Sequence, residues 1–289
     1  MSFKIKCPAK INLFLHITNK RPDGFHELQS LITKIDLFDE LAVEKSTKFS
    51  LEINGEFAEF IEINNNLFTK ILDYFVKNFH IDSNLKIRLQ KNIPVGAGLG
   101  GGSSNGAYFI KILNEIFALK LSKIDMQKIS LNFGSDIAFF FENEVCLMRG
   151  RGEFLTEISH FKNDFEKLKI LLINPKIHLS TKEIFQDFAQ KKINNFNQNL
   201  PKEFFFEKSL QEILQNSNND LEEPAISKAP IISEILQNLR KFSPICAKMS
   251  GSGSSCFAIF DNEENLQETY EFFIKNYPNF FVKKLNFCD

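Results

Sequence analysis

Two kinds of hydrophobic spacing alternate along the chain. Apolar side chains occupy every second position over residues 11–17 and again over 85–90, the pattern of half-buried strands. Residues 66–79 and 103–117 instead carry apolar side chains at helical spacing, the first behind an asparagine that can cap a helix. Strands and helices follow one another without a regular βαβ rhythm or an internal repeat. This favours an α+β protein of two lobes that divide near residue 155.

The second half of the chain continues this mixture. The apolar run 168–175 ends at a proline and predicts a buried strand. A polar helix is expected over 263–276, before a last extended segment. Between 193 and 224 the chain is rich in Asn, Gln and Phe, which suggests a surface connection with a short helix over 203–215. Residues 219–222 have the spacing of a helix start with an acidic third residue.

Charge and cysteine content narrow the class of protein. The chain has 35 Lys and Arg against 36 Asp and Glu, so no excess of positive charge marks it for nucleic acid or an anionic membrane. Its five cysteines are scattered and never spaced as CxxC, which argues against a disulfide framework or a zinc site and favours a reducing cytoplasm. Lysines interrupt the first residues, and no apolar run is long enough to span a bilayer, so we expect neither a signal peptide nor a membrane span.

A glycine-rich segment precedes the helix expected from residue 103. Five glycines fall between positions 96 and 102, where backbone N–H groups and a helix N-terminus can approach a phosphate. This favours anion binding over the alternative, a flexible hairpin loop. No lysine follows the glycines, which excludes a Walker loop. Gly96, Gly98 and Gly101 match GxGxxG, a weak signal that leaves a dinucleotide-binding oxidoreductase as an alternative.

Three segments together resemble the GHMP superfamily of small-molecule kinases. They are PAKINLFLHI with RPDGFHEL (8–28), PVGAGLGGGSSNGA (94–107) and AKMSGSGSSCFAIF (247–260). The first of them, with NDLE at 219–222, resembles the branch that phosphorylates a cytidine diphosphate sugar alcohol in non-mevalonate isoprenoid synthesis. A homoserine or mevalonate type of GHMP kinase is the alternative within the superfamily. Phe25 stands where this branch usually has Tyr, and Gly106 where it usually has Ala.

The resemblance implies a two-lobed fold and a kinase reaction. The N-terminal lobe, residues 1–155, would resemble domain 2 of ribosomal protein S5 and carry the glycine loop for ATP. The C-terminal lobe, residues 156–289, would be ferredoxin-like. The expected partners are ATP and the cytidine diphosphate sugar alcohol, without nucleic acid or membrane. Magnesium is implied by ATP chemistry rather than by any visible cluster of acidic ligands.

Two residues match the family's catalytic pair. Phosphoryl transfer requires alignment, an acceptor for the alcohol proton and nearby positive charge. By resemblance, Asp136 would accept the proton of the attacking hydroxyl. Lys10 would keep that carboxylate ionised and neutralise charge on the transferring phosphoryl group. Without the resemblance, Asp136 would be interpreted as a turn or cap residue and Lys10 as a solvent-facing lysine at a strand end.

The resemblance also supplies binding residues. On the substrate side, Phe25 and Phe185 would enclose the cytosine ring, His26 would bond its edge, and Asn12 and Thr181 would contact the rest of the molecule. Without the resemblance to the family, Asn12 would be interpreted as a structural amide, His26 as an ordinary exposed histidine and Phe185 as a core residue. The residues expected at ATP are Asn66, Leu67, Pro94, Gly96, Gly98, Leu99, Gly100, Gly101, Gly102, Ser103 and Ser104. The glycines at 251 and 253 either let the backbone approach the site or form a plain turn.

Overall fold

The chain forms two compact units, each assembled from several stretches of sequence. A computed structural model describes residues 2–63, 66–143, 145–191 and 207–288. The first unit comprises Met1–Ala9, Leu37–Val95 and Gly100–Asn143, and the second comprises Lys10–Asp36, Gly96–Leu99 and Glu144–Asp289. These units differ from the two consecutive domains predicted from the sequence, residues 1–155 and 156–289. That division into domains stays a prediction.

Two long strands supply segments to both units. β1 (Ser2–Lys20) pairs with β2 (His26–Lys45), and the predicted turn at 21–24 joins them. Gly24 has a φ of +85°, and its N–H donates to the Arg21 carbonyl at 3.1 Å. The turn prediction is confirmed, because glycine adopts this left-handed conformation without steric cost.

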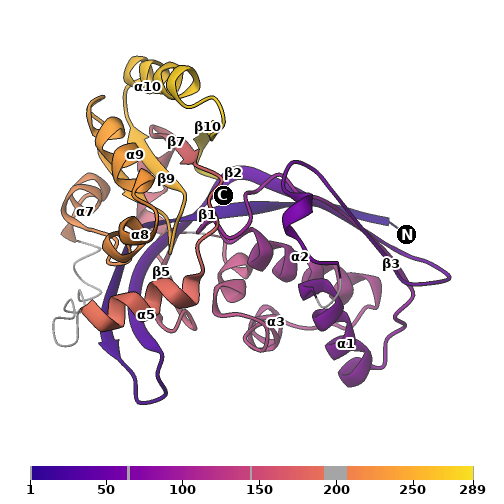
Figure 1. The fold of residues 1–289 in the computed structure, drawn as a ribbon. Helices are drawn as coiled ribbons and strands as arrows, with labels where there is room; N and C mark the ends of the chain where they lie inside the picture. The colour runs from indigo at the N-terminus through magenta and orange to yellow at the C-terminus, as the bar shows by residue number, and fades with distance from the viewer. Residues whose placement is uncertain (1, 64–65, 144, 192–206, 289) are drawn as a thin grey trace. The chain divides into compact units, whose positions relative to one another are not determined.

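In the first unit, three helices pack on one side of the strands (Figure 1). The end of β2 pairs antiparallel with β4 (Leu85–Gln90), and β4 pairs parallel with β3 (Ser50–Asn54). The helices are α1 (Leu67–Phe79), α2 (Gly101–Ile116) and α3 (Lys123–Ser130), with 3₁₀ helices η1 (Ala58–Phe60) and η2 (Ser135–Phe141). The Asn66 side chain accepts a hydrogen bond from the Thr69 N–H at 3.1 Å, which confirms the predicted cap of α1.

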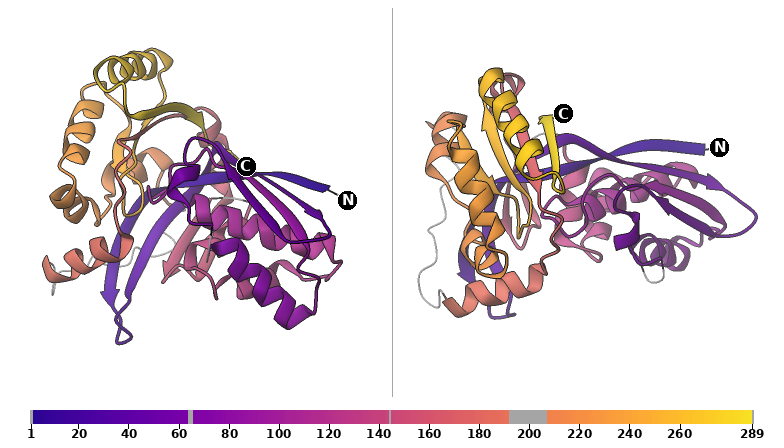
Figure 2. Two further views of the ribbon diagram at one scale, coloured as in Figure 1. Left: turned by 45° about the vertical axis from the view of Figure 1, so that its right-hand side comes forward. Right: turned by 45° about the horizontal axis from the view of Figure 1, so that its top comes forward.

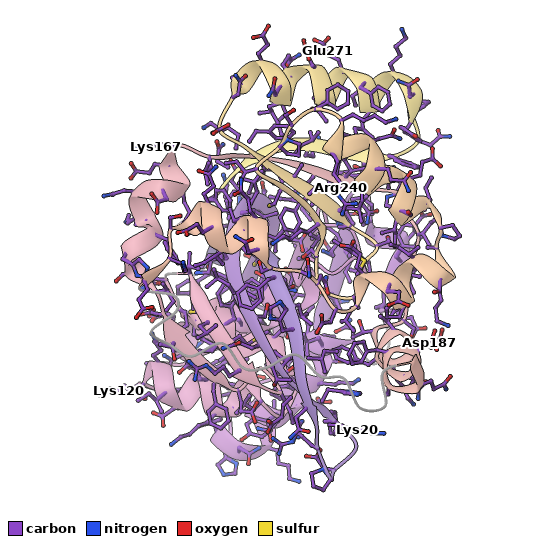
Figure 3. The ribbon with its side chains drawn as sticks, turned by 90° about the vertical axis from the view of Figure 1, so that its left-hand side faces the viewer. Lys20, Lys120, Lys167, Asp187, Arg240 and Glu271 are labelled. Carbon is purple, nitrogen blue, oxygen red and sulfur yellow. The ribbon has the colours of Figure 1, made fainter. Side chains whose placement is uncertain are left out.

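In the second unit, a four-stranded antiparallel sheet has the order β10-β7-β9-β8. Its strands are β7 (Lys169–Asn174), β8 (Cys246–Met249), β9 (Cys256–Phe260) and β10 (Phe281–Asn286). Helices α9 (Ile231–Arg240) and α10 (Glu263–Asn276) lie side by side over this sheet (Figure 2), and Glu271 of α10 points away from it (Figure 3). The strand predictions for 168–175 and for the last segment are confirmed.

The remaining elements of the second unit surround this sheet and the β1–β2 hairpin. β5 (Cys146–Gly150) pairs with β2, and β6 (Phe154–Glu157) pairs with β5. The helices are η3 (Ser159–Phe161), α4 (Lys162–Glu166), α5 (Thr181–Lys191), α7 (Leu210–Asn216) and α8 (Glu222–Lys228). Within the described ranges, no helix is long and apolar enough to cross a membrane.

One strand prediction was wrong in its burial. Residues 11–17 were expected to be half-buried, yet β1 is buried on both faces there. Leu15 and Ile17 belong to the core beneath α8 and α9, while Asn12 and Phe14 on the other face are 1% and 0% exposed. Alternation of polar and apolar residues predicted a solvent face, but this face is covered, and Asn12 bonds there to Lys10 and Ser30.

Two helix boundaries also differ from the sequence predictions. α2 begins at Gly101 rather than Ser103, because Gly100 serves as its N-cap with a φ of +66° and accepts the Ser104 N–H at 2.8 Å. The short helix expected over 203–215 begins at Leu210, where Ser209 caps it, and residues 203–206 lie outside the described part of the chain. Ser209 forms a capping box with Glu212, a local signal that had been overlooked.

The segment 219–222 does lead into a helix, but Asn219 does not cap it. α8 starts at Glu222 with Leu221 as its N-cap. The Asn219 amide instead donates to the carbonyls of Met249 and Gly251 at 2.8 and 2.7 Å. Asn219 therefore ties this segment to the third of the family motifs.

A buried ion pair anchors the chain just before the glycine loop. Lys91 Nζ lies 2.6 Å from Asp39 Oδ2, and the two side chains are 2% and 0% exposed. Asp39 Oδ1 also accepts the backbone N–H groups of Asn92 and Ile93, each at 2.8 Å. Burial lowers the pKa of the Lys91 ammonium, and the carboxylate of Asp39 opposes this change. The pair thus fixes the backbone that enters the loop.

Replacing Asp39 by alanine is expected to lower the free energy of unfolding by about 3–5 kcal/mol, because the Lys91 ammonium would remain buried without its partner. Urea unfolding measures this loss. The matched control is Glu52→Ala, which removes a 3.0 Å pair with Lys86 whose side chains are 34% and 47% exposed. That change should cost less than about 1 kcal/mol. Equal losses in the two variants would contradict the assignment.

Candidate active site

Lys10 and Asn12 form a buried polar pair on β1. Lys10 is 4% exposed, and its ammonium donates to Asn12 Oδ1 at 2.5 Å. The Lys10 backbone N–H donates to the carbonyl of Leu99 in the glycine loop at 2.9 Å. The interpretation of Lys10 as a solvent-facing lysine is therefore wrong. A buried ammonium that is held beside a phosphate-binding type of loop has the placement expected of an electrostatic group.

A single hydroxyl joins the three motif segments. Ser250 Oγ accepts the Asn12 backbone N–H at 3.3 Å and donates to the Gly98 carbonyl at 2.9 Å. Gly98 has a φ of +76°, and a β-carbon there would lie 2.0 Å from the Ser250 carbonyl oxygen. Only glycine allows this approach of two backbones. No local pattern distinguishes Ser250 in the sequence, although it lies next to the glycine at 251.

The first residue of α5 and the segment before it also contact the third motif. Thr181 Oγ1 lies 2.8 Å from Ser252 Oγ, and Ser254 Oγ donates to the Ile177 carbonyl. His178 lies against the glycine loop, since a β-carbon on Gly96 would come within 2.0 Å of its Nδ1. Thr181 is thus placed beside the third motif. His178, which the sequence analysis missed, carries no local motif that would have marked it.

His26 and Phe185 form a ring pair. Their centroids are 5.6 Å apart with an interplanar angle of 30°, and Phe188 meets His26 edge-on at 6.0 Å. His26 Nε2 is buried and has no hydrogen-bond partner among the described residues. Burial, and then the charge of Lys20 near the end of the hairpin (Figure 3), lower the pKa of His26. Both effects favour the neutral imidazole, whose Nε2 is buried without a partner in the described part of the chain.

Phe25 lies in a different environment. Its ring is 53% exposed, and the Arg151 guanidinium lies 4.1 Å from the ring centroid. Phe185 faces His26 rather than Phe25 in this structure. The ring of Phe25 keeps accessible surface on which a planar base can stack.

The start of α2 belongs to the first unit and carries most of the predicted ATP residues. Ser104 is fully buried, and its hydroxyl has no hydrogen-bond partner within the described chain. A β-carbon on Gly101 would lie 2.9 Å from Lys91 Nζ, so the buried ion pair supports this turn from below. Gly102 is exposed and has nothing within 4 Å of such a carbon. Pro94, which enters the loop, is buried.

The same unit positions Asn66, Leu67 and Asp136. Leu67 packs so closely on α2 that a β-carbon at Gly106 would approach its Cδ2 to 2.7 Å, which gives a packing reason for glycine at 106. Asp136 lies in the first turn of η2 and is partly buried. Lys111 of α2 donates to the Phe140 carbonyl at 2.9 Å and so fastens η2 to α2. The predicted ATP residues of α2 and the predicted base therefore share one rigid support.

The side chains near the predicted ATP site suit a metal ion that is bound mainly by ATP better than one that is bound by the protein alone. In the part of the chain that the structure describes, no group of three or more His, Cys, Asp or Glu side chains is arranged to hold a metal ion. Mg²⁺ commonly takes phosphate oxygens, waters and only one or two protein ligands. The unpartnered hydroxyl of Ser104 at a helix N-terminus suits that mode of binding.

Comparison with known proteins decides the family. The model of the GHMP kinases N terminal domain matches residues 66–143, and the GHMP kinases C terminal model matches 202–279. A Clostridium botulinum protein called 4-diphosphocytidyl-2-C-methyl-D-erythritol kinase is 33% identical over 96% of this chain and 98% of its own length. The chain belongs to this family of GHMP kinases. It is a phosphotransferase that uses ATP and an alcohol acceptor.

Solved structures agree with this assignment. A crystal structure of 4-(cytidine 5'-diphospho)-2C-methyl-D-erythritol kinase covers 98% of this GHMP kinase and 99% of its own chain, with a TM-score of 0.77 and 25% identity. A homoserine kinase of Cytophaga hutchinsonii and a mevalonate kinase of Methanococcus jannaschii share the fold at 17% and 15% identity, with TM-scores of 0.66 and 0.69. They cover 99% and 100% of this chain, and 94% and 99% of their own. The α+β GHMP fold is confirmed, and the dinucleotide-binding alternative is wrong.

Gly98→Ala is expected to destabilise this GHMP kinase strongly, because the new methyl group would meet the Ser250 carbonyl oxygen at 2.0 Å and an L-residue is strained at this φ. We expect a fall in the thermal midpoint of about 5 °C or more. Gly102→Ala is the matched control in the same loop. Its β-carbon meets no atom, so its midpoint should stay unchanged or rise slightly. Equal midpoints for both variants would contradict the close approach.

Proposed function

We propose that this kinase transfers the γ-phosphate of ATP to the 2-hydroxyl of 4-diphosphocytidyl-2-C-methyl-D-erythritol. The observation that carries the proposal is the buried Lys10–Asn12 pair, bonded through Lys10 N–H to the glycine loop in a chain whose relatives bear that substrate's name. The weaker likeness to homoserine and mevalonate kinases supports this acceptor over theirs.

In the proposed mechanism Asp136 accepts the proton of the 2-hydroxyl as that oxygen attacks the γ-phosphorus. A new oxygen–phosphorus bond forms, and the bond from the γ-phosphorus to the bridging oxygen of ADP breaks. The ammonium of Lys10 stabilises the charge that develops on the transferring group. Asn12 aligns the acceptor. These roles are supported by residue chemistry and by the resemblance of the surrounding segments to the family's motifs.

ATP would bind along the glycine loop and the first turn of α2. Backbone N–H groups at Gly100, Gly101 and Gly102, with the helix dipole, suit the phosphates. Ser103 and Ser104 would contact phosphate or a Mg²⁺ ion, which supplies charge neutralisation when bound. Asn66 and Leu67 would border the adenine. The remaining loop residues proposed for ATP are Pro94, Gly96, Gly98 and Leu99.

The cytidine end of the substrate would use the rings of the second unit. The base stacks on Phe25 and Phe185 and bonds to the unpartnered nitrogen of His26, while Thr181 contacts the diphosphate or sugar. We place the reaction in the cytoplasm, since all five cysteines are free. We also propose residues 1–155 and 156–289 as the two functional domains.

The first experiment measures ADP formation with the cytidine substrate, homoserine and mevalonate as separate acceptors. We expect turnover of the cytidine substrate alone, and a fall in kcat of about 10²–10⁴-fold in Asp136→Asn. Asp73→Asn, an exposed residue of α1, is the matched control and should keep full activity. Turnover of another alcohol alone would overturn the substrate, and full activity of Asp136→Asn would overturn the base.

A second experiment tests the base-binding rings. Phe185→Ala should raise KM for the cytidine substrate about 5- to 100-fold and leave KM for ATP unchanged, because one stacking face is lost. Phe154→Ala, which removes a ring that is 63% exposed, is the control. Burial lowers the pKa of His26, so KM for the cytidine substrate should be level from pH 7 to 8 and rise only in acid. A parallel rise of both KM values would argue against the assignment.

A further inference from the structure

The side chain of Asn12 lies between two buried partners. Its Oδ1 accepts from Lys10 Nζ at 2.5 Å, and its Nδ2 donates to Ser30 Oγ on β2 at 2.8 Å. Ser30 is fully buried, as Asn12 almost is. Lys10, Asn12 and Ser30 therefore form a chain of hydrogen bonds in which no bulk water can replace a lost partner.

The direction of this chain depends on the single proton of the Ser30 hydroxyl. Ser30 Oγ donates that proton to the Phe14 carbonyl at 2.5 Å. A serine hydroxyl has one donor and two acceptor lone pairs, so its oxygen can then only accept. The group that faces it from Asn12 must be a donor, the amide nitrogen. The carbonyl oxygen of the same amide is thereby turned toward Lys10.

The reversed amide would be unfavourable at both ends. Its NH₂ group would face the Lys10 ammonium, which can only donate, and its oxygen would face a hydroxyl whose proton is already committed. Both contacts would leave buried polar atoms unsatisfied. The hydroxyl of Ser30 thus selects one of two amide orientations, and that orientation supplies the acceptor for Lys10.

The backbone of Asn12 is held independently of its side chain. The Asn12 N–H donates to Ser250 Oγ at 3.3 Å, and the neighbouring Lys10 N–H donates to the Leu99 carbonyl. Loss of the Ser30 hydroxyl would therefore leave β1 in place and release mainly the Asn12 amide. The contribution of the Ser30 hydroxyl to the site can therefore be tested without displacing the backbone of β1.

We propose that Ser30 is a positioning residue for phosphoryl transfer, which orients the Asn12 amide and through it the Lys10 ammonium. The proposal rests on the proposed function of Lys10. Ser30 is fully buried, so its surface is not open to a substrate. Its contribution is to present a carbonyl oxygen of Asn12, rather than an NH₂ group, to the ammonium.

The test uses two substitutions that remove the acceptor and one that keeps it. Ser30→Ala deletes the hydroxyl, and Ser30→Cys replaces its oxygen by a larger sulfur that accepts hydrogen bonds weakly. In both, kcat should fall about tenfold, the loss expected for a hydrogen bond to a charged group, while KM for ATP stays unchanged. Ser30→Thr keeps the hydroxyl and should retain most of the wild-type kcat.

The pH profile separates positioning from general loss of structure. In Ser30→Ala the Lys10 ammonium loses its oriented acceptor, so the alkaline fall in kcat should move to lower pH. A role in packing alone would lower kcat equally at every pH. An unmoved alkaline limb with a normal thermal midpoint would overturn the proposal.

A double-variant cycle provides the second check. If Ser30 acts through the Asn12 amide, Ser30→Ala should have almost no further effect on kcat in an Asn12→Ala background. If the fold decreases in kcat of the two single variants multiply in the double variant, the two residues act separately and the inference is refuted. The wild-type assay is run first, so absence of turnover with the cytidine substrate would be a failure of the proposed function. Normal wild-type turnover with an unaffected Ser30→Ala variant would be a failure of the Ser30 role alone.

Discussion

The site is organised around the hydroxyl of Ser250. This one group accepts from the first motif at Asn12 and donates to the second at Gly98, while belonging to the third. The three segments are distant in sequence, and each carries too little structure of its own to hold a precise geometry. A buried hydroxyl suits such a junction because it can donate and accept at once. Since these bonds are shielded from water, the loss of one leaves a polar group without a substitute.

Several lysine ammonium groups of this chain are buried, and their hydrogen-bond partners differ. Lys91 has a carboxylate partner, Asp39, and serves as a structural anchor. Lys248 donates to the Leu13 carbonyl and to Ser217 Oγ, both neutral acceptors, and burial lowers its pKa to about 8. Lys10 faces the Asn12 carbonyl oxygen. The carboxylate of Asp39 compensates the buried charge of Lys91, which suits a structural anchor.

Close backbone approach is the second constraint on the site. Gly98 lies against the Ser250 carbonyl, and Gly96 lies against the ring of His178. Gly98 has no room for a β-carbon because a backbone carbonyl lies there, whereas at Gly96 the His178 ring would have to move; the positive φ of both positions favours glycine. Gly102 has open space around it and is not required for that reason. The role proposed for Gly102 is to leave room for a phosphate, which differs from the packing role of Gly98.

The sequence by itself determined the elements, the family motifs and the candidate residues. Helical spacing behind Asn66, alternation over 85–90 and the turn ending at Gly24 are local properties, encoded by neighbours within a few residues. The motifs likewise predicted a phosphate loop and a catalytic pair, because a resemblance to a family can be recognised from the sequence without knowledge of tertiary contacts. Boundaries that depend on a cap were less well predicted: α2 begins at Gly101 rather than Ser103, and α7 begins at Leu210 rather than 203.

Only the tertiary structure decided how the polar residues of the site are used. Ser30 and Ser250 lie 18 and 238 positions from Asn12, and no local pattern links them to it. The same is true of Asn219, whose amide bonds the third motif instead of capping its own helix. Hydrogen bonds are satisfied by whichever partner the fold brings within about 3 Å, irrespective of separation in sequence. Periodicity therefore predicted which residues lie on one face of β1, while the burial and orientation of that face were set by the segments that pack on it.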